Sequence, residues 1–231
     1  MAATQATDDH AAVTLLHDLP LHEYHLRLDG HAWTIAHSGA ILSEEDEQRY
    51  LGEDRSRAPY GLALWPASIA LAHELVSRAS ELPGRRILEL GAGTGLPGIV
   101  AATYGARVVQ TDRLEEALTI GRMNANRNGI HSIDHRIADW TEWNDTDRYD
   151  IILGADVIYA PRLQPFLRTI FDTNLAPGGR LLLGDPFRSA SIRLLEAMEQ
   201  DGWTVHMTKW KLGGEWGERA IGGFECYRAT G

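Results

Sequence analysis

From residue 86 onward, several apolar segments end in or beside acidic residues, and the first of them runs into a turn rich in glycine. Residues 85–100 read RRILELGAGTGLPGIV, with four glycines in eight positions after the apolar residues. Glycine has no Cβ, so such a turn lets a ligand lie directly against the main chain. We therefore expect a cofactor there, and the spacing of the glycines bears on which one.

Two registers of the glycines compete. Gly93, Gly95 and Gly98 form the dinucleotide pattern G-x-G-x-x-G, but the first glycine of that pattern belongs directly after the strand. This reading needs a strand two residues longer than the apolar run. Gly91, Gly93 and Gly95, with Glu89 two residues before them, form G-x-G-x-G at the strand end. That register favours S-adenosylmethionine, which has no pyrophosphate and would lie flat across the bare turn; an NAD-dependent oxidoreductase stays open as an alternative.

Acids also end the next two strands. Asp112 follows Gly93 by about 20 residues, where nucleoside sites of α/β proteins place a carboxylate on the ribose hydroxyls. The alternative is a helix cap, and one side chain can serve both purposes. Asp139 could accept a hydrogen bond from the adenine amino group, and the Trp140 indole could stack on the purine. Trp140 could equally fill the core.

The segment DIILGADVIYAP places Asp156 and Tyr159 at the end of the fourth strand, the edge at which open α/β sheets bind ligands. If a methyl group were transferred there to a lysine amine, the acceptor would arrive protonated, because its reference pKa is about 10.4. Desolvation by aromatic walls would lower that pKa. Asp156 would orient the ammonium and Tyr159 would supply a wall and a hydroxyl; helix capping and core packing are the alternatives.

Alternating strand and helix signals position these residues. The sequence predicts strands at 86–90, 107–111, 135–138, 150–155 and 180–184, and helices at 97–104, 114–127, 162–174 and 189–200. This alternation is typical of a parallel sheet covered on both faces. The tail segments TVHMTKW and GGFECYRA have only a loop between them, which predicts an antiparallel hairpin at the sheet edge. The expected fold is α/β and Rossmann-like.

The first 58 residues are expected to form an N-terminal extension, followed by one catalytic domain over 59–231. Asp29-Gly30 between two alternating runs predicts a hairpin over about 22–38. Polar residues 43–59 predict a short helix and a loop. Pro66 suits the start of a helix that continues through an apolar pattern to about residue 82.

The composition excludes some partners. The net charge of −10 argues against a nucleic-acid-binding surface. Cys226 is the single cysteine, so no intrachain disulfide is expected, and the N-terminus lacks the pattern of a secretory signal. No membrane span is predicted, and we expect a cytoplasmic monomer. His22 and His25 lack accompanying acids or cysteines, so no metal site is expected.

The motifs LELGAGTGLPGIVAATYGARVVQTD, DW and DIILGADVIYAPRLQPFLRTI together resemble the seven-β-strand protein-lysine methyltransferases of methyltransferase family 16. The resemblance covers about residues 60 to 185. It implies the class I methyltransferase fold, with S-adenosylmethionine as the methyl donor. It places Asp156 and Tyr159 at the ends of the Asp-x-x-Tyr motif near the acceptor lysine. The residues that it implies for donor contact are Trp65, Gly91, Ala92, Gly93, Asp112, Trp140 and Ala155.

The resulting hypothesis is transfer of a methyl group from S-adenosylmethionine to a lysine side chain of a protein. Two alternatives remain: N-methylation of a small-molecule amine, and a catalytically inactive module that binds the donor. The fourth strand ends in ADVIY, not in the N/D-P-P-Y tetrapeptide of DNA amino-methylases. Paired glutamates that would clamp a guanidinium are not evident after this strand.

Overall fold

The computed structural model of the chain describes residues 19–39, 60–213 and 219–229. Two expected features lie outside these ranges: the helix and loop over 43–59, and the boundary between residues 58 and 59. Among the described residues, no helix combines the length and the apolar character needed to cross a membrane. They also contain no group of three or more histidine, cysteine, aspartate or glutamate side chains arranged to hold a metal ion.

A seven-stranded sheet forms the centre of the molecule, in the order β5-β4-β3-β6-β7-β9-β8. Strands β3 to β7 are parallel, and β9 pairs antiparallel with both β7 and β8. The expected parallel sheet and its C-terminal edge hairpin are confirmed. The strands are β3 (Arg86–Leu90), β4 (Arg107–Asp112), β5 (Asp134–Ile137), β6 (Tyr149–Ala155), β7 (Leu175–Asp185), β8 (Trp203–Leu212) and β9 (Arg219–Arg228).

One strand starts earlier than the sequence predicts. The apolar run indicated a strand from residue 180, whereas β7 begins at Leu175. Leu175 pairs with Tyr149 of β6, and the register then shifts before regular pairing resumes between Ile151 and Arg180. The intervening Pro177-Gly178-Gly179 reads as a turn in the sequence, but here it lies in a bulged strand, where such residues are tolerated.

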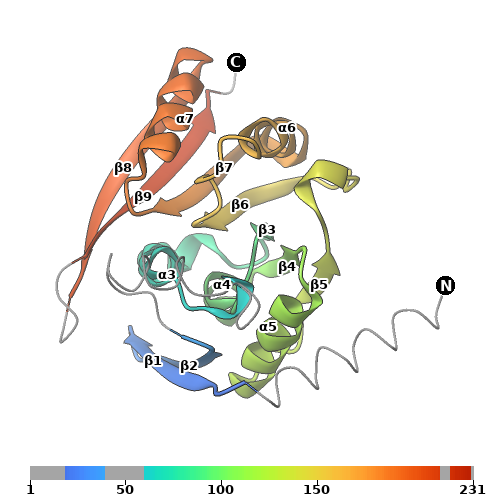
Figure 1. Cartoon of the computed structure of the whole chain (residues 1–231), viewed down its shortest axis with the longest axis vertical. Coiled ribbons are helices and arrows are strands. Elements are labelled where there is room, and N and C mark those ends of the chain that lie inside the picture. Colours follow the sequence, from blue (N-terminus) through green and yellow to red (C-terminus); the bar gives the residue numbers. More distant parts are fainter. Residues whose placement is uncertain (1–18, 40–59, 214–218, 230–231) are drawn as a thin grey trace.

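Helices cover both faces of the sheet (Figure 1). On one face lie α3 (Pro66–Ser77), α4 (Leu96–Thr103) and α5 (Glu115–Arg127), and on the other α6 (Gln164–Asn174) and α7 (Ser189–Gln200). The α3 helix ends before residue 82, and a 3₁₀ turn, η2 (Ala79–Glu81), follows it. Two further 3₁₀ turns are η1 (Tyr60–Leu62) and η3 (Trp140–Glu142). Central strand residues such as Leu88 and Ile152 are fully buried because both faces are covered.

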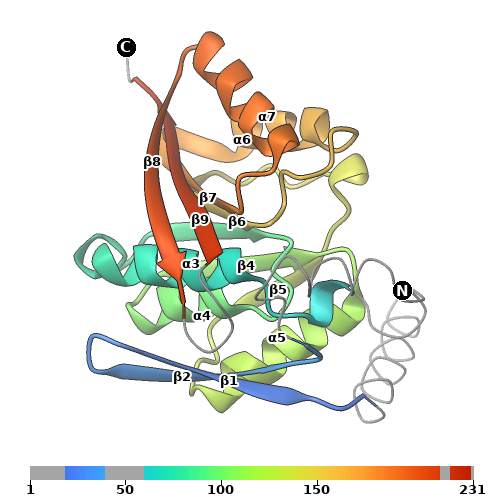
Figure 2. The same ribbon diagram turned by 60° about the vertical axis from the view of Figure 1, so that its left-hand side comes forward.

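The expected N-terminal hairpin is present as β1 (His22–Leu28) and β2 (His31–His37), paired antiparallel. Asp29 and Gly30 both adopt positive φ, 47° and 76°, as a two-residue hairpin turn requires. Leu26, Trp33 and Ile35 join the hydrophobic core shared with α3 and α4. Figure 2 shows the hairpin lying along α5. The hairpin is therefore packed on the sheet domain through this helix.

Two asparagines of α5 and its C-cap hold the outer edge of β2. Asn124 accepts from the Ala36 N–H (2.8 Å) and donates to the Ala36 carbonyl (3.0 Å). Asn128 does the same with Thr34, at 2.9 Å in each direction. Four helical residues rise about 6 Å and two strand residues about 6.6 Å, so the amides of Asn124 and Asn128 match alternate residues of the strand. Side-chain amides thus satisfy an otherwise unpaired strand edge.

Replacing Asn124 should destabilise the protein strongly. Asn124 is fully buried and also donates to the Thr94 carbonyl (2.9 Å). Asn124→Ala would therefore leave the Ala36 N–H, the Ala36 carbonyl and the Thr94 carbonyl buried without their partner. We expect a loss of about 3 kcal/mol in the free energy of unfolding, measured by urea denaturation. Asn126→Ala, at an exposed position on the same helix, should change it by less than about 0.5 kcal/mol. Equal effects of the two substitutions would contradict the assigned role.

Candidate active site

The glycine turn follows β3 directly. The strand ends at Leu90, and Gly91, Gly93 and Gly95 take left-handed φ values of 61°, 54° and 81°. The dinucleotide register needed a strand two residues longer, so the structure supports the G-x-G-x-G register. A Cβ on Gly93 would lie 3.2 Å from the Gly61 carbonyl oxygen. The surroundings of the turn leave little room for side chains, so its main chain is bare.

Glu89 lies beneath this turn. Its carboxylate is buried and accepts from the Gly98 N–H (3.0 Å) and from Gln110 Nε2 (2.7 Å). Gln110 also donates to the Gly95 carbonyl (2.9 Å). A Cβ on Gly98 would collide with Glu89 and Gln110, so this glycine allows α4 to approach the sheet closely. Burial raises the pKa of Glu89 to about 8. Glu89 thus supports the turn from the sheet side.

Asp112 ends β4 and links the glycine turn to α5. Its Oδ2 accepts from the Gly93 N–H (3.1 Å) and its Oδ1 from the Leu114 N–H (3.0 Å). Burial raises the pKa of this carboxyl group, and the backbone donors oppose that rise. The helix-cap alternative is not borne out, because the N-cap of α5 is Leu114 and it has no side-chain cap bond; Asp112 instead orders the residues before the helix and bonds directly to the glycine turn. Asp112 stands next to the turn, where a ribose contact would be made.

Asp139 and Trp140 lie at the neighbouring strand end. Asp139 Oδ1 accepts from the Thr141 N–H and hydroxyl, both at 2.8 Å, and these bonds lower the pKa of Asp139. Trp140 is half-buried and packs on the core beneath α6. Its Cζ2 would lie 3.3 Å from a Cβ on Gly91. The indole therefore borders both the core and the glycine turn.

Asp156 and Tyr159 follow β6. Asp156 has a φ of 55° and its N–H donates to the Gly184 carbonyl (2.9 Å). The next helix, α6, begins only at Gln164, so Asp156 does not cap it. The Tyr159 side chain is half exposed, at 50%, so it does not fill the core. Both alternatives that the sequence left open for this pair are therefore excluded.

Two residues that the sequence did not single out join this pair. Arg188 Nη1 donates to Asp156 Oδ1 and to Asp185 Oδ2, the latter at 3.2 Å. The Arg188 guanidinium carbon lies 5.8 Å from the centre of the Tyr159 ring. Asp185 is the last residue of β7, so it stands at the same sheet edge as Asp112. That position was the available signal for Asp185; the contact of Arg188 with Asp156 depends on tertiary structure.

The remaining predicted donor contacts lie at the same edge. Trp65 directly precedes α3 and its carbonyl accepts from the Ser68 N–H (3.0 Å) and hydroxyl (2.6 Å). The Ala92 N–H donates to the Thr111 carbonyl (2.9 Å), and Ala155 is the last residue of β6. Their contact with a donor stays a prediction.

The model of a protein family described as lysine methyltransferase matches residues 44–191. The chain belongs to this family. It is similar to the protein N-lysine methyltransferase METTL21A of Danio rerio, 35% identical over 63% of this chain and 69% of that protein. METTL21A of Xenopus tropicalis is 37% identical over 52% of this chain and 57% of its own. The histone-arginine methyltransferase METTL23 of Xenopus laevis is 34% identical over 52% and 53%.

These matches span about half the length of the first curated relatives. Solved structures share the fold. A ribosomal protein L11 methylase from Lactobacillus delbrueckii has a TM-score of 0.55 at 22% identity, covering 70% of this chain and 79% of its own. The magnesium protoporphyrin IX methyltransferase of Synechocystis, solved with bound SAH, has a TM-score of 0.54 at 15% identity, covering 82% and 96%. The expected class I methyltransferase fold is confirmed.

The buried Glu89 should make stability depend on pH. Its pKa is about 8 in the folded chain and near 4.5 when unfolded, so the folded state holds the extra proton between these values. Stability from this group is complete below about pH 4.5 and is lost as the pH rises to about 8. Glu89→Gln should flatten the fall in unfolding free energy between pH 5 and 8, measured by urea denaturation. Parallel curves for Glu89→Gln and wild type would refute this; the exposed Glu196→Gln should follow wild type.

Removing the Asp112 carboxylate should weaken donor binding. We expect Asp112→Ala to raise the dissociation constant of S-adenosylhomocysteine at least tenfold in isothermal titration calorimetry, since bonds to a charged group contribute about 1.5–3 kcal/mol. Asp134→Ala, at the opposite end of the neighbouring strand, is the matched control and should bind normally. Unchanged affinity in Asp112→Ala would remove this residue from the donor site.

Proposed function

We propose that this protein transfers a methyl group from S-adenosylmethionine to the side-chain nitrogen of a lysine in a protein substrate. The observation that carries the proposal is the meeting of three features at the ends of adjacent strands: the glycine turn after β3, Asp112 on β4, and Asp156 with Tyr159 after β6. Membership of the lysine methyltransferase family supports the same reaction.

The residues at this edge fit the donor. The bare turn of Gly91 and Gly93 suits the part of S-adenosylmethionine that must lie against main chain, and Asp112 suits the ribose hydroxyls. Trp140 offers an aromatic face and Asp139 a carboxylate for the adenine. The full set that we propose to hold or support the donor is Trp65, Glu89, Gly91, Ala92, Gly93, Asp112, Asp139, Trp140 and Ala155.

The acceptor chemistry needs little covalent help. When bound, S-adenosylmethionine supplies a methyl group on a sulfonium, and the electrons of the broken S–C bond stay on sulfur. The protein must align the amine with that methyl group and let the amine lose its proton to water. Asp156 would hold the incoming side chain through its carboxylate, and Tyr159 would shield it with its ring. Both stand beside the last residue of β6.

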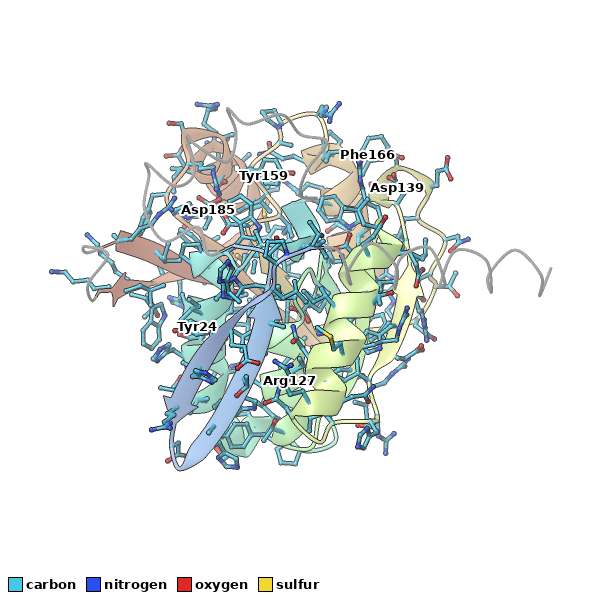
Figure 3. The ribbon with its side chains drawn as sticks, turned by 60° about the horizontal axis from the view of Figure 1, so that its bottom comes forward. Tyr24, Arg127, Asp139, Tyr159, Phe166 and Asp185 are labelled. Atoms are coloured by element: carbon cyan, nitrogen blue, oxygen red, sulfur yellow. The ribbon has the colours of Figure 1, made fainter. Side chains whose placement is uncertain are left out.

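A protein substrate suits the surface around the site. Tyr159 and Phe166 expose 50% and 40% of their surface, and large apolar side chains of this kind are common in protein interfaces. Figure 3 shows Tyr159, Phe166 and Asp185 toward one end of the molecule, away from Tyr24 and Arg127. The net charge of −10 favours a basic partner and disfavours nucleic acid. We further propose that the protein is a cytoplasmic monomer; the single cysteine suits a reducing compartment.

Labelling tests the reaction. The full chain is incubated with tritiated S-adenosylmethionine and a dialysed lysate, and labelled protein is hydrolysed to its amino acids. Labelled methyl-lysine is the expected product. Methyl-arginine, the product class suggested by the names of the METTL23 relatives, would replace the lysine proposal, as would label confined to small molecules. Tight donor binding with no label anywhere would instead favour the inactive module.

Replacing the Asp156 carboxylate should separate transfer from donor binding. Asparagine tolerates the positive φ of Asp156 (55°), so Asp156→Asn removes the charge with little backbone strain. We expect methyl transfer to fall at least tenfold while the affinity for S-adenosylhomocysteine stays within about twofold, because a bond to a charged group is lost only at the acceptor. The exposed Asp172→Asn should match wild type. Equal loss of both properties would move Asp156 to the donor site.

A further inference from the structure

The Arg188 guanidinium occupies the position at which the proposed acceptor site offers partners to a cation. It donates to Asp156 on the turn after β6 and to Asp185 at the end of β7, and it lies beside the Tyr159 ring. The proposed acceptor lysine needs the same carboxylate and the same ring. An acceptor lysine at this carboxylate would therefore lie beside a second cation.

Arg188 is held firmly in this position. Its own N–H donates to Asp185 Oδ1 (2.7 Å), so backbone and side chain are anchored to one fully buried carboxylate. Ser191 in the first turn of α7 donates to the other oxygen of Asp185 (2.6 Å). The preceding Phe187 adopts a φ of 63°, uncommon for a bulky residue, and packs edge-on against Phe224. The chain thus accepts a strained turn that places Arg188 at Asp185.

A bridge also fixes the two sides of the site relative to each other. Gln164 Nε2 donates to the Ile158 carbonyl (2.8 Å) in the Asp-x-x-Tyr turn and to the Ala190 carbonyl (3.1 Å) at the start of α7. The segment that carries Asp156 and Tyr159 is therefore tied to the segment that carries Arg188. The ion pair does not depend on one flexible side chain alone.

The charges of this group bear on the reaction. A carboxylate beside an amine favours its protonated form, which cannot attack, whereas a nearby cation favours the neutral form. The described ionisable groups that face Arg188 are Asp156 from the turn after β6, Asp185 from β7 and the Tyr159 phenol. Arg188 offsets one of these two carboxylates, so the group attracts a further cation less strongly than the two carboxylates alone would.

We propose that Arg188 is a positioning residue for methyl transfer, which offsets the charge of Asp156 so that an acceptor lysine can bind beside this carboxylate and still lose its proton. This inference rests on the proposed function. The step itself is balanced: the amine nitrogen forms the new N–C bond, the S–C bond of the donor breaks with its electrons left on sulfur, and the proton leaves to water.

Two substitutions test this role: Arg188→Met removes a positive charge from the site, and Asp185→Asn removes a negative charge. Methyl transfer by the full chain to dialysed lysate protein is measured as tritium in methyl-lysine, at saturating donor, from pH 6 to 10. Arg188→Met should move the acid limb of the rate profile up by about one pH unit and slow transfer about tenfold near pH 7. Asp185→Asn should move it down. Arg188→Lys, which keeps the charge, should restore the limb to within a few tenths of a unit.

The controls separate this inference from other outcomes. Thermal melting and S-adenosylhomocysteine affinity are measured for every variant. If Arg188→Met does not fold, the shift of the acid limb in Asp185→Asn tests the proposal instead, and an unmoved limb in that variant would overturn it. Faster transfer by Arg188→Met at every pH, without a shift, would show that Arg188 merely blocks the site and would overturn the proposal. Slower transfer with an unmoved acid limb would also overturn it. No methyl-lysine from the wild type would refute the proposed function itself, and this inference with it.

Discussion

The close approach of α4 and the glycine turn to the sheet is the constraint on which the candidate site depends. Glu89 and Gln110, on neighbouring strands, bond to Gly98 and Gly95 across a gap that no side chain could enter. Because those contacts are buried, each of their hydrogen bonds acts in a medium of low dielectric constant, which strengthens it. Buried residues on the sheet side thus fix the position of the turn.

The second organising feature is a row of acids at the carboxyl ends of the parallel strands. Asp112, Asp156 and Asp185 end β4, follow β6 and end β7. Each accepts bonds from backbone or side-chain donors, which makes its burial tolerable. The row places the carboxylate that we propose for the ribose, Asp112, on the same sheet edge as the two carboxylates that bind the Arg188 guanidinium. One sheet edge can in this way serve both partners of a transfer reaction.

Local patterns in the sequence predicted much of this arrangement. The Asp29-Gly30 hairpin, the order of strands and helices, and the glycine register follow from spacing and from turn chemistry, which act over a few residues. The contact of Arg188 with Asp156 joins residues 32 positions apart through a strained turn, and no periodicity reports such a contact. Likewise, the sequence could place Glu89 near the turn but could not indicate that it faces the sheet side. The early start of β7 depends on a bulge that only pairing with β6 reveals.

The amide of Asn124 touches two parts of the molecule at once, the β2 edge at Ala36 and the Thr94 carbonyl within the glycine turn. Local opening of the hairpin would therefore leave the oxygen and one N–H of an amide that also holds the turn without their partners. The two segments should behave as one cooperative unit in hydrogen exchange. A ligand that stiffens the turn should then also slow exchange of hairpin amides on the outer side of α5, which would link a region with no assigned chemistry to the proposed donor site.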